Sequence, residues 1–186
     1  MKHVIENANC LDVVKALSDE SVHLTVTSPP YDSLRDYGDD FVGFSLEDAA
    51  VLFWQLLRAT CTGGVLVWVV ADETSKLGES TTSFKQALLA VASGWQLHDT
   101  MIYEKAQAFT GSKYAYFNSF EYMFVFRKSG KVRTFNPLTD RRNVRGGVVE
   151  STAKAGMRSD GSVPERKMRR VALFGKRKNV WRYVVS

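Results

Sequence analysis

Apolar positions in the first two thirds of the chain switch repeatedly between helical and strand-like spacing. Apolar residues three positions apart in residues 10–17 predict a helix with one apolar face, while residues 22–27 alternate β-branched and polar side chains and predict a strand. That strand should end at Ser28-Pro29-Pro30, because proline lacks the N–H group that continued pairing requires. Residues 3–6 predict one further short strand.

The same alternation continues through the middle of the chain. Ser45 followed by acidic residues marks a helix start, and the apolar stripe of that helix runs toward Gly63-Gly64. Residues 65–71 are uninterruptedly apolar, as expected of a strand covered on both faces of a parallel sheet. The remaining expected elements are a helix over 83–92 and strands over 95–104 and 120–127. Strands separated by helices indicate an α/β domain with a doubly wound, mostly parallel sheet and flanking helices.

This periodicity fades after residue 127, where the charge of the chain changes sign. Residues 1–126 contain 8 Lys/Arg and 16 Asp/Glu, a net of −8, whereas residues 127–186 contain 17 Lys/Arg and 4 Asp/Glu, a net of +13. We therefore expect an α/β core over residues 1–127 and an irregular basic region over 128–186, with a short helix over 166–170. Such a region either contacts a polyanion or is a solvated, partly disordered tail.

Composition excludes several classes of protein. The 186 residues, 45% of them apolar, suffice for one compact core, but the longest apolar run, residues 65–71, is far shorter than the roughly 20 residues that span a bilayer. Cys10 and Cys61 are too few for a disulfide framework or a thiolate zinc site, and the three histidines match no metal-binding pattern. We expect a cytoplasmic protein with no membrane segment and no metal.

The stretch with most chemical information is Thr27-Ser28-Pro29-Pro30-Tyr31, at the carboxyl end of a predicted strand, where open α/β sheets place their ligands. Two prolines stiffen the backbone and leave their carbonyl groups pointing outward. The Ser28 hydroxyl and the Pro29 carbonyl can accept hydrogen bonds from an exocyclic amine, while Tyr31 can stack on a flat base. The stretch therefore predicts a pocket for the amino group of a nucleobase.

Ser28-Pro29-Pro30-Tyr31 resembles the catalytic tetrapeptide of the DNA amino-methyltransferases, which methylate cytosine N4 or adenine N6. Further stretches resemble segments of the class in which the catalytic half comes first, and they follow in the expected order: 9–12, 17–22, 34–38, 94–97, 104–105, 121–128 and 179–182. The resemblance implies a partial Rossmann-like methyltransferase fold, S-adenosylmethionine as the methyl donor, and double-stranded DNA as the partner, with the target base flipped out of the duplex.

The resemblance, together with the charge pattern, assigns roles to individual residues. The catalytic residues are Ser28, Pro29, Pro30 and Tyr31. Asn9, Cys10 and Ser28 are expected to line one side of the cofactor pocket. The DNA-binding residues are expected to be Arg35, in the loop after the tetrapeptide, and a set of arginines in the basic region, namely Arg141, Arg142, Arg145, Arg169 and Arg170.

The chain departs from this family in one respect. The glycine-rich FxGxG turn that binds S-adenosylmethionine is missing, and the stretch 109–112 imitates only its start, because Lys113 stands in place of the second glycine. We therefore interpret the chain as the catalytic half of a bacterial or phage DNA methyltransferase, of the kind found in restriction-modification systems, with cytosine N4 favoured over adenine N6. The alternatives are a catalytically inactive DNA-binding remnant and one subunit of a split methyltransferase, whose second polypeptide carries the cofactor half.

Overall fold

The chain forms two compact units, which we call the core unit and the basic unit. The computed structural model describes residues 3–30, 43–75, 78–109, 113, 116–151, 162 and 168–183. The core unit comprises Met1–Thr134 together with Asn179–Ser186, and the basic unit is Phe135–Lys178. Helices and the main sheet belong to the core unit, whereas the described part of the basic unit contains only short strand pairs.

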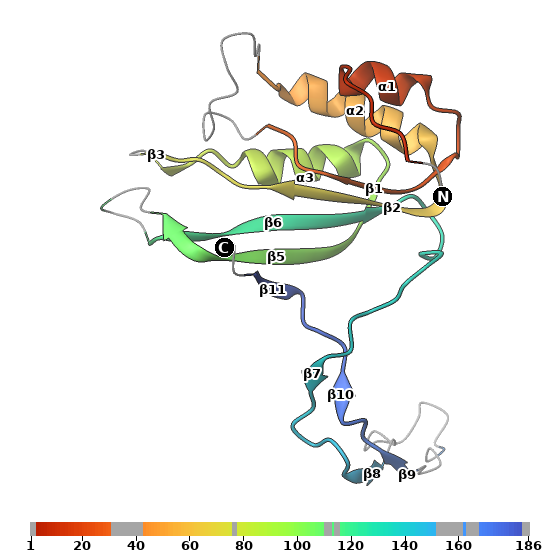
Figure 1. Ribbon diagram of the computed structural model, residues 1–186, viewed down its shortest axis with the longest axis vertical. Coiled ribbons are helices and arrows are strands. Elements are labelled where there is room, and N and C mark those ends of the chain that lie inside the picture. The colour runs from red at the N-terminus through yellow and green to blue at the C-terminus, as the bar shows by residue number, and fades with distance from the viewer. Residues whose placement is uncertain are drawn as a thin grey trace. The chain divides into compact units, whose positions relative to one another are not determined.

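The core unit is built on a five-stranded sheet of order β1-β2-β6-β5-β11 (Figure 1). The strands are β1 (Val22–Thr27), β2 (Thr60–Val70), β5 (Gln96–Phe109), β6 (Asn118–Arg127) and β11 (Val180–Tyr183). β1 pairs parallel with β2 and β11 parallel with β5, while β6 pairs antiparallel with both β2 and β5. Four of the five strands therefore run in one direction. The predicted α/β class with a mostly parallel sheet is confirmed.

Three helices accompany the sheet in the described part of the chain: α1 (Cys10–Ala16), α2 (Leu46–Ala59) and α3 (Thr82–Ala92). The Asn9 side chain caps α1, and Ser45 and Asp48 form a reciprocal capping box at the start of α2. A two-residue pair of strands, β3 (Thr74–Ser75) and β4 (Gly78–Glu79), separates β2 from α3. The predicted helices over 10–17 and 83–92 are confirmed to within one residue at each end.

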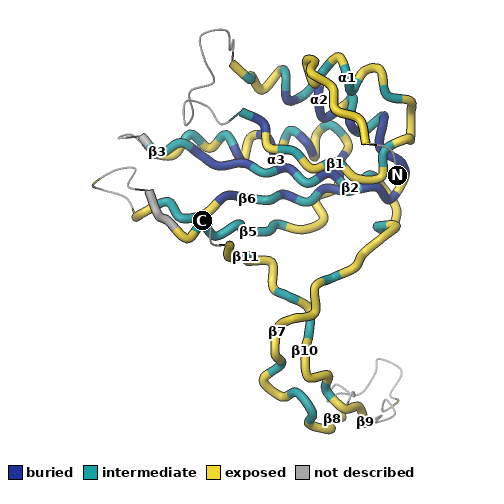
Figure 2. Tube along the Cα trace, in the orientation of Figure 1, coloured by how far each residue is buried: buried dark blue, intermediate teal, exposed yellow. Residues whose placement is uncertain are grey.

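The hydrophobic core lies between α2, α3 and one face of the sheet. Leu66, Trp68 and Val70 alternate along β2 toward the helices, and they pack with buried side chains of α2 and of β6. Figure 2 shows buried positions along α2, α3, β2 and β6. The indole N–H groups in this core are satisfied: Trp68 Nε1 donates to Gln86 Oε1 at 2.8 Å, and Trp95 Nε1 donates to the Phe53 carbonyl at 3.0 Å. This packing holds β2 in place, and the parallel pairing with β2 positions β1 and the Ser28-Pro29-Pro30 stretch that follows it.

The basic unit contains two short antiparallel pairs. β7 (Arg141–Arg142) pairs with β10 (Phe174–Gly175), and β8 (Val149–Ser151) pairs with β9 (Met168–Arg170). The expectation of a helix over 166–170 is wrong at its described residues, because Met168–Arg170 forms a strand against β8. None of the described residues between 135 and 178 is buried.

Three local expectations differ from the structure. Residues 3–6 form no strand, since they have no pairing partner among the described residues. The strand expected over 65–71 begins at Thr60, because Gly63 adopts a positive φ of 76° and the β1–β2 register shifts there, so the glycine pair forms a bulge within the strand. Residues 180–183, expected in the basic region, return to the sheet as β11.

Candidate functional site

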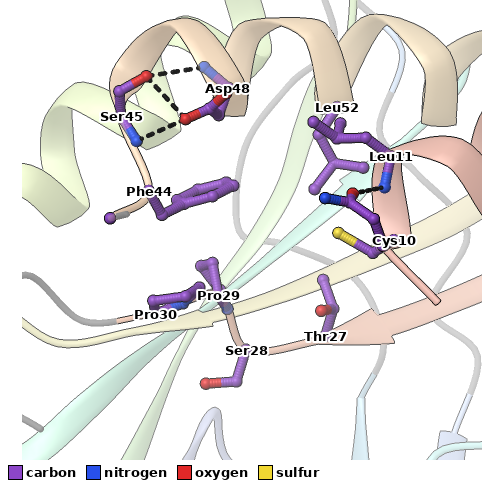
Figure 3. A pocket seen from close by; sticks show the side chains of 12 residues that line it. Cys10, Leu11, Thr27, Ser28, Pro29, Pro30, Phe44, Ser45, Asp48 and Leu52 are labelled. Atoms are coloured by element: carbon purple, nitrogen blue, oxygen red, sulfur yellow. Dashed lines mark hydrogen bonds between the residues drawn. The ribbon is translucent and has the colours of Figure 1, made fainter. Parts of the chain in front are cut away.

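A cavity of about 840 Å³ opens at the carboxyl end of β1, between that strand and the N-terminal ends of α1 and α2 (Figure 3). Its walls come from three stretches that are distant in sequence. The first stretch contributes Asn9, Cys10 and Leu11, the second contributes Thr27, Ser28, Pro29 and Pro30, and the third contributes Gly43, Phe44, Ser45, Asp48 and Leu52. The parallel β1–β2 pair and the two helix starts thus bring Ser28, Pro29 and Pro30 to the same place as Asn9 and Cys10.

The Ser28-Pro29-Pro30 stretch continues directly from β1. Pro29 is buried, Pro30 is half-buried and Ser28 is exposed. Side chains alternate along a strand, so Ser28 points opposite to Thr27, and Figure 3 shows its hydroxyl directed away from Phe44 and Leu52. The rigid turn therefore presents a hydroxyl at the rim of the cavity.

Asn9 and Cys10 form the wall contributed by α1. The Asn9 Oδ1 atom accepts a hydrogen bond from the Leu11 N–H at 2.9 Å, which leaves the amide nitrogen of Asn9 outside the cap. Cys10 is an exposed free thiol at the first helical position. Two other predicted site residues, Tyr31 and Arg35, lie outside the described residues.

The α2 side of the cavity contains residues that sequence reasoning missed. Ser45 donates to Asp48 Oδ2 through its N–H at 3.0 Å and its hydroxyl at 2.9 Å, while the Asp48 N–H donates to Ser45 Oγ at 3.1 Å. These bonds from the Ser45 backbone and hydroxyl hold the pKa of the Asp48 carboxyl below its ordinary value, so it carries a negative charge beside the cavity.

Phe44 adds an aromatic ring to the same wall. The ring lies 6.4 Å from the Trp68 ring, centroid to centroid, and Figure 3 places it next to Pro29 and Pro30. It directly precedes the N-cap Ser45, at the position where an apolar residue commonly packs against the first turn of a helix. That pattern is the signal from which Phe44 could have been found.

The predicted DNA-binding arginines of the basic unit are exposed and fall into two groups. Three are held by neighbours within the unit: Arg145 pairs with Glu150 at 2.9 Å, Arg141 Nε donates to the Lys176 carbonyl at 3.0 Å, and Arg170 Nη1 donates to the Gly147 carbonyl at 3.2 Å. Arg142 and Arg169 form no ion pair within the described part of the chain.

Other kinds of site find little support in the residues that are described. Over residues 3–30, 43–75, 78–109 and the later described stretches, no group of three or more His, Cys, Asp or Glu side chains could hold a metal ion. Within the same part of the chain, every helix is too short or too polar to cross a bilayer.

Comparison with known families identifies the chain. The model of the N6/N4 DNA methylase family matches residues 22–182. The chain belongs to this DNA methylase family. The orphan methyltransferase M.BamHII of Bacillus amyloliquefaciens is 43% identical over 167 residues, which cover 89% of this chain and 61% of that protein. The resemblance inferred from Ser28-Pro29-Pro30-Tyr31 and its flanking stretches is thereby confirmed at the level of the family.

Solved structures agree with this assignment. TTHA0409 of Thermus thermophilus, named as a DNA modification methylase, is 26% identical with a TM-score of 0.53, and the match covers 68% of this chain and 54% of that protein. A second structure of that protein contains S-adenosyl-L-methionine. The cytosine-N4-specific PvuII DNA methyltransferase shares the fold, with a TM-score of 0.54 at 13% identity, over 66% of this chain and 48% of its own. The chain spans between about half and 61% of the length of these relatives.

Proposed function

We propose that this chain supplies the catalytic half of a DNA amino-methyltransferase. In this role it transfers a methyl group from S-adenosylmethionine to an exocyclic amine of a flipped base, with cytosine N4 favoured over adenine N6. The observation that carries the proposal is the position of Ser28-Pro29-Pro30 at the carboxyl end of β1, on the rim of a cavity that Asn9 and Cys10 also line. The family membership of residues 22–182 supports the same reaction.

The chain activates the amine through hydrogen-bond acceptors. The lone pair of an aromatic amine is delocalised into the ring and is a poor nucleophile. When Ser28 Oγ and the Pro29 carbonyl accept hydrogen bonds from its two N–H groups, the nitrogen shifts toward a tetrahedral geometry and its lone pair becomes available to the methyl carbon. The N–C bond would form as the donor's S–C bond breaks, and the nitrogen would then release one of its two protons. Tyr31 stacks on the base, which has left the duplex at a cost of a few kcal/mol. The serine at the first position of the tetrapeptide favours cytosine.

The cavity fits part of the methyl donor. Its volume of about 840 Å³ lies within the range of small-molecule sites, and Leu11, Phe44 and Leu52 give it apolar walls. Asn9 and Cys10 would hold the donor from one side, with Ser28 at the rim. When bound, S-adenosylmethionine supplies an electrophilic methyl group. The sequence contains no glycine-rich FxGxG turn for close backbone approach, and the relatives M.BamHII and TTHA0409 are longer than this chain, so we propose that residues matching their additional length complete the donor site.

The basic unit contacts the DNA backbone. Arg141, Arg142, Arg145, Arg169 and Arg170 neutralise phosphates and hold the duplex, while Arg35 contributes from the loop after the tetrapeptide. We place this reaction in the cytoplasm, where chromosomal or phage DNA is the substrate and where the thiols of Cys10 and Cys61 stay reduced.

The test is methyl transfer by the chain together with the segment of the Bacillus amyloliquefaciens relative that lies outside the matched region. Labelled S-adenosylmethionine and duplex DNA are supplied, and the modified nucleoside is identified by mass spectrometry. Ser28→Ala should lower the rate by about 10²–10³-fold, because one positioned acceptor is lost. Ser18→Ala, before the opposite end of β1, is the matched control and should transfer methyl at the wild-type rate.

Each outcome has a defined meaning. N4-methylcytosine as the product would support cytosine as the target base. N6-methyladenine as the product would make adenine the target base, with the same type of reaction. DNA binding without any methyl transfer would favour an inactive DNA-binding remnant. Wild-type turnover by Ser28→Ala would contradict the role assigned to the tetrapeptide.

A further inference from the structure

The guanidinium of Arg58 joins the last turn of α2 to the carboxyl end of α1, the helix beside it in Figure 1. Its Nη1 atom donates to the Leu17 carbonyl at 2.8 Å, and its Nη2 atom donates to the carbonyls of Val14 and Lys15 at 3.2 Å each. Nη1 also pairs with the Asp19 carboxylate. The three carbonyls lie in the last turn of α1 or at its C-cap. We call this set of contacts the Arg58 clamp.

The clamp itself is held in a fixed geometry. The Arg58 Nε atom donates to Gln55 Oε1 at 3.0 Å, so all three nitrogens of the planar guanidinium have acceptors. The Arg58 side chain is only 24% exposed. The Glu20 N–H donates to the Arg58 carbonyl at 3.2 Å, which adds a backbone contact between the segment after α1 and the end of α2. The guanidinium is therefore oriented both by α2 and by the chain that follows α1.

The helix α1 depends on such external contacts more than α2 and α3 do. It has seven residues, none of which is buried, and its Leu11 and Val14 side chains pack against the core but are only partly buried. Carbonyl groups in the last turn of a helix have no partner within that helix, and a helix of this length is marginal in water. The Arg58 clamp supplies donors to these carbonyls and places a positive charge at the negative end of the helix dipole. We therefore infer that Arg58 fixes the position of α1.

The opposite end of α1 forms one wall of the cavity at the end of β1. Asn9 and Cys10 line that wall, whereas Arg58 does not line the cavity. A helix of seven residues is about 10 Å long and moves as one body, so a shift at its carboxyl end would displace both side chains. Ser28 is positioned differently, since it follows β1, which pairs with β2. The Arg58 clamp therefore acts on the wall assigned to the methyl donor and leaves Ser28 in place.

We propose that Arg58 is a positioning residue for S-adenosylmethionine, which holds Asn9 and Cys10 at the distance from Ser28 that the methyl donor requires. This inference rests on the proposed function. Because only the donor wall moves when the clamp is lost, donor binding should weaken and the KM for the donor should rise, while kcat and DNA affinity are retained. An arginine that only stabilised the fold would instead reduce the fraction of active molecules and leave the KM of the remaining molecules unchanged.

The first measurement follows the clamp without any donor. Arg58→Met keeps most of the aliphatic stem and removes every donor of the guanidinium. Hydrogen–deuterium exchange of the full chain, resolved by peptide mass spectrometry, should become about tenfold faster over residues 10–17 and stay unchanged over α3. Gln86→Met is the matched control, because it removes the acceptor of the Trp68 indole N–H within the core. It should leave the exchange of residues 10–17 unchanged.

The second measurement is the affinity for the donor. S-adenosylmethionine is titrated by calorimetry into the chain mixed with the complementary segment, by which we mean the part of M.BamHII outside the region matched to this chain. Arg58→Met should weaken binding about tenfold and raise the KM in the labelled-methyl assay by the same factor, with kcat and DNA affinity within about twofold of the wild type. Arg58→Lys keeps the charge but lacks the planar fork, so its donor affinity should be intermediate. Gln86→Met should bind the donor like the wild type.

The possible results are distinguishable. Faster exchange over residues 10–17, together with weaker donor binding in the Arg58 variants alone, supports the proposal. A lower kcat with unchanged KM and unchanged donor affinity would overturn it, because Arg58 would then serve stability only. Wild-type donor affinity in Arg58→Lys would also overturn it, since the fork would not be required. If circular dichroism shows Arg58→Met to be unfolded, Arg58→Lys decides the question by the same two measurements.

Failure of the proposed function gives a different result. A wild-type mixture that binds the donor but transfers no methyl would refute the proposed function, while the calorimetric comparison would still decide the role of Arg58. A wild-type mixture that binds no donor would overturn the role of Arg58 as well.

Discussion

The core unit and the basic unit are stabilised by different interactions. In the core unit, large side chains such as Phe53, Trp68 and Phe126 are fully removed from water between the helices and the sheet. In the basic unit, none of the described residues is buried, and the side-chain contacts include exposed ion pairs such as Arg145–Glu150 and Arg177–Asp140. Exposed ion pairs contribute little to stability, so the basic unit gains far less from its own contacts.

This difference fits the two tasks that we propose for the chain. A methyl-transfer site needs acceptors held in fixed positions, which a packed sheet provides at the end of β1. A surface that follows phosphates needs charge, and residues 135–178 contain 12 Lys/Arg against 4 Asp/Glu. We therefore expect the stability of the protein to depend on the core unit, and the affinity for DNA to depend on the basic unit.

The largest expected effect is that of Trp68→Ala. Trp68 is fully buried and packs on Phe53 with 4.5 Å between ring centroids, so its removal leaves a cavity and an unpaired Gln86. The free energy of unfolding should fall by about 3–5 kcal/mol in urea denaturation followed by circular dichroism. Phe174→Ala, at a position 54% exposed in the basic unit, should cost less than about 1 kcal/mol. Equal losses in both variants would remove the contrast between the units.

A smaller effect is expected on DNA affinity. The double variant Arg142→Gln, Arg169→Gln removes two charges that form no ion pair among the described residues. Each phosphate contact contributes about 0.9 to the slope of log affinity against log salt, so the slope should become shallower by roughly 1.8. Arg177→Gln removes a guanidinium already paired with Asp140 and should change the slope less. Fluorescence anisotropy at several salt concentrations measures both. Identical slopes in the wild type and the double variant would contradict the role of the basic unit.

The smallest expected effect is on the thermal stability of the protein at acidic pH. The pKa of Asp48 is lowered by hydrogen bonds from Ser45, and the pKa of Asp140 is lowered by the Arg177 side chain. A carboxyl whose pKa is lower in the folded state stabilises the fold above its unfolded pKa of about 4, and this contribution is lost as the pH falls through the folded pKa. Asp48→Asn should flatten the decline of thermal stability of the core unit below about pH 4. Asp140→Asn should leave the decline of the core unit unchanged, because Asp140 belongs to the basic unit. A flatter decline in the Asp140→Asn variant would contradict the expectation that the core unit and the basic unit are stabilised separately.

Several parts of this structure follow from local sequence. The Ser45-to-Asp48 pattern predicts the start of α2, and the β-branched alternation of residues 22–27 predicts β1 and the position of the tetrapeptide. Other parts depend on partners distant in sequence. Nothing local places Phe44 and Leu52 in the same cavity as Ser28, brings β11 back to β5, or inserts β6 antiparallel between β2 and β5. The glycine pair at 63–64 resembles a strand boundary, although its bulge lies within β2.

We propose that this chain provides the tetrapeptide and depends on a complementary segment for the methyl donor. It is tested most directly by labelled methyl transfer to duplex DNA, measured with the purified chain alone and with the complementary segment of the Bacillus amyloliquefaciens relative. We expect no transfer by the chain alone and transfer by the mixture. Multiple turnovers by the chain alone would contradict this account, because the donor site would then be complete within these 186 residues.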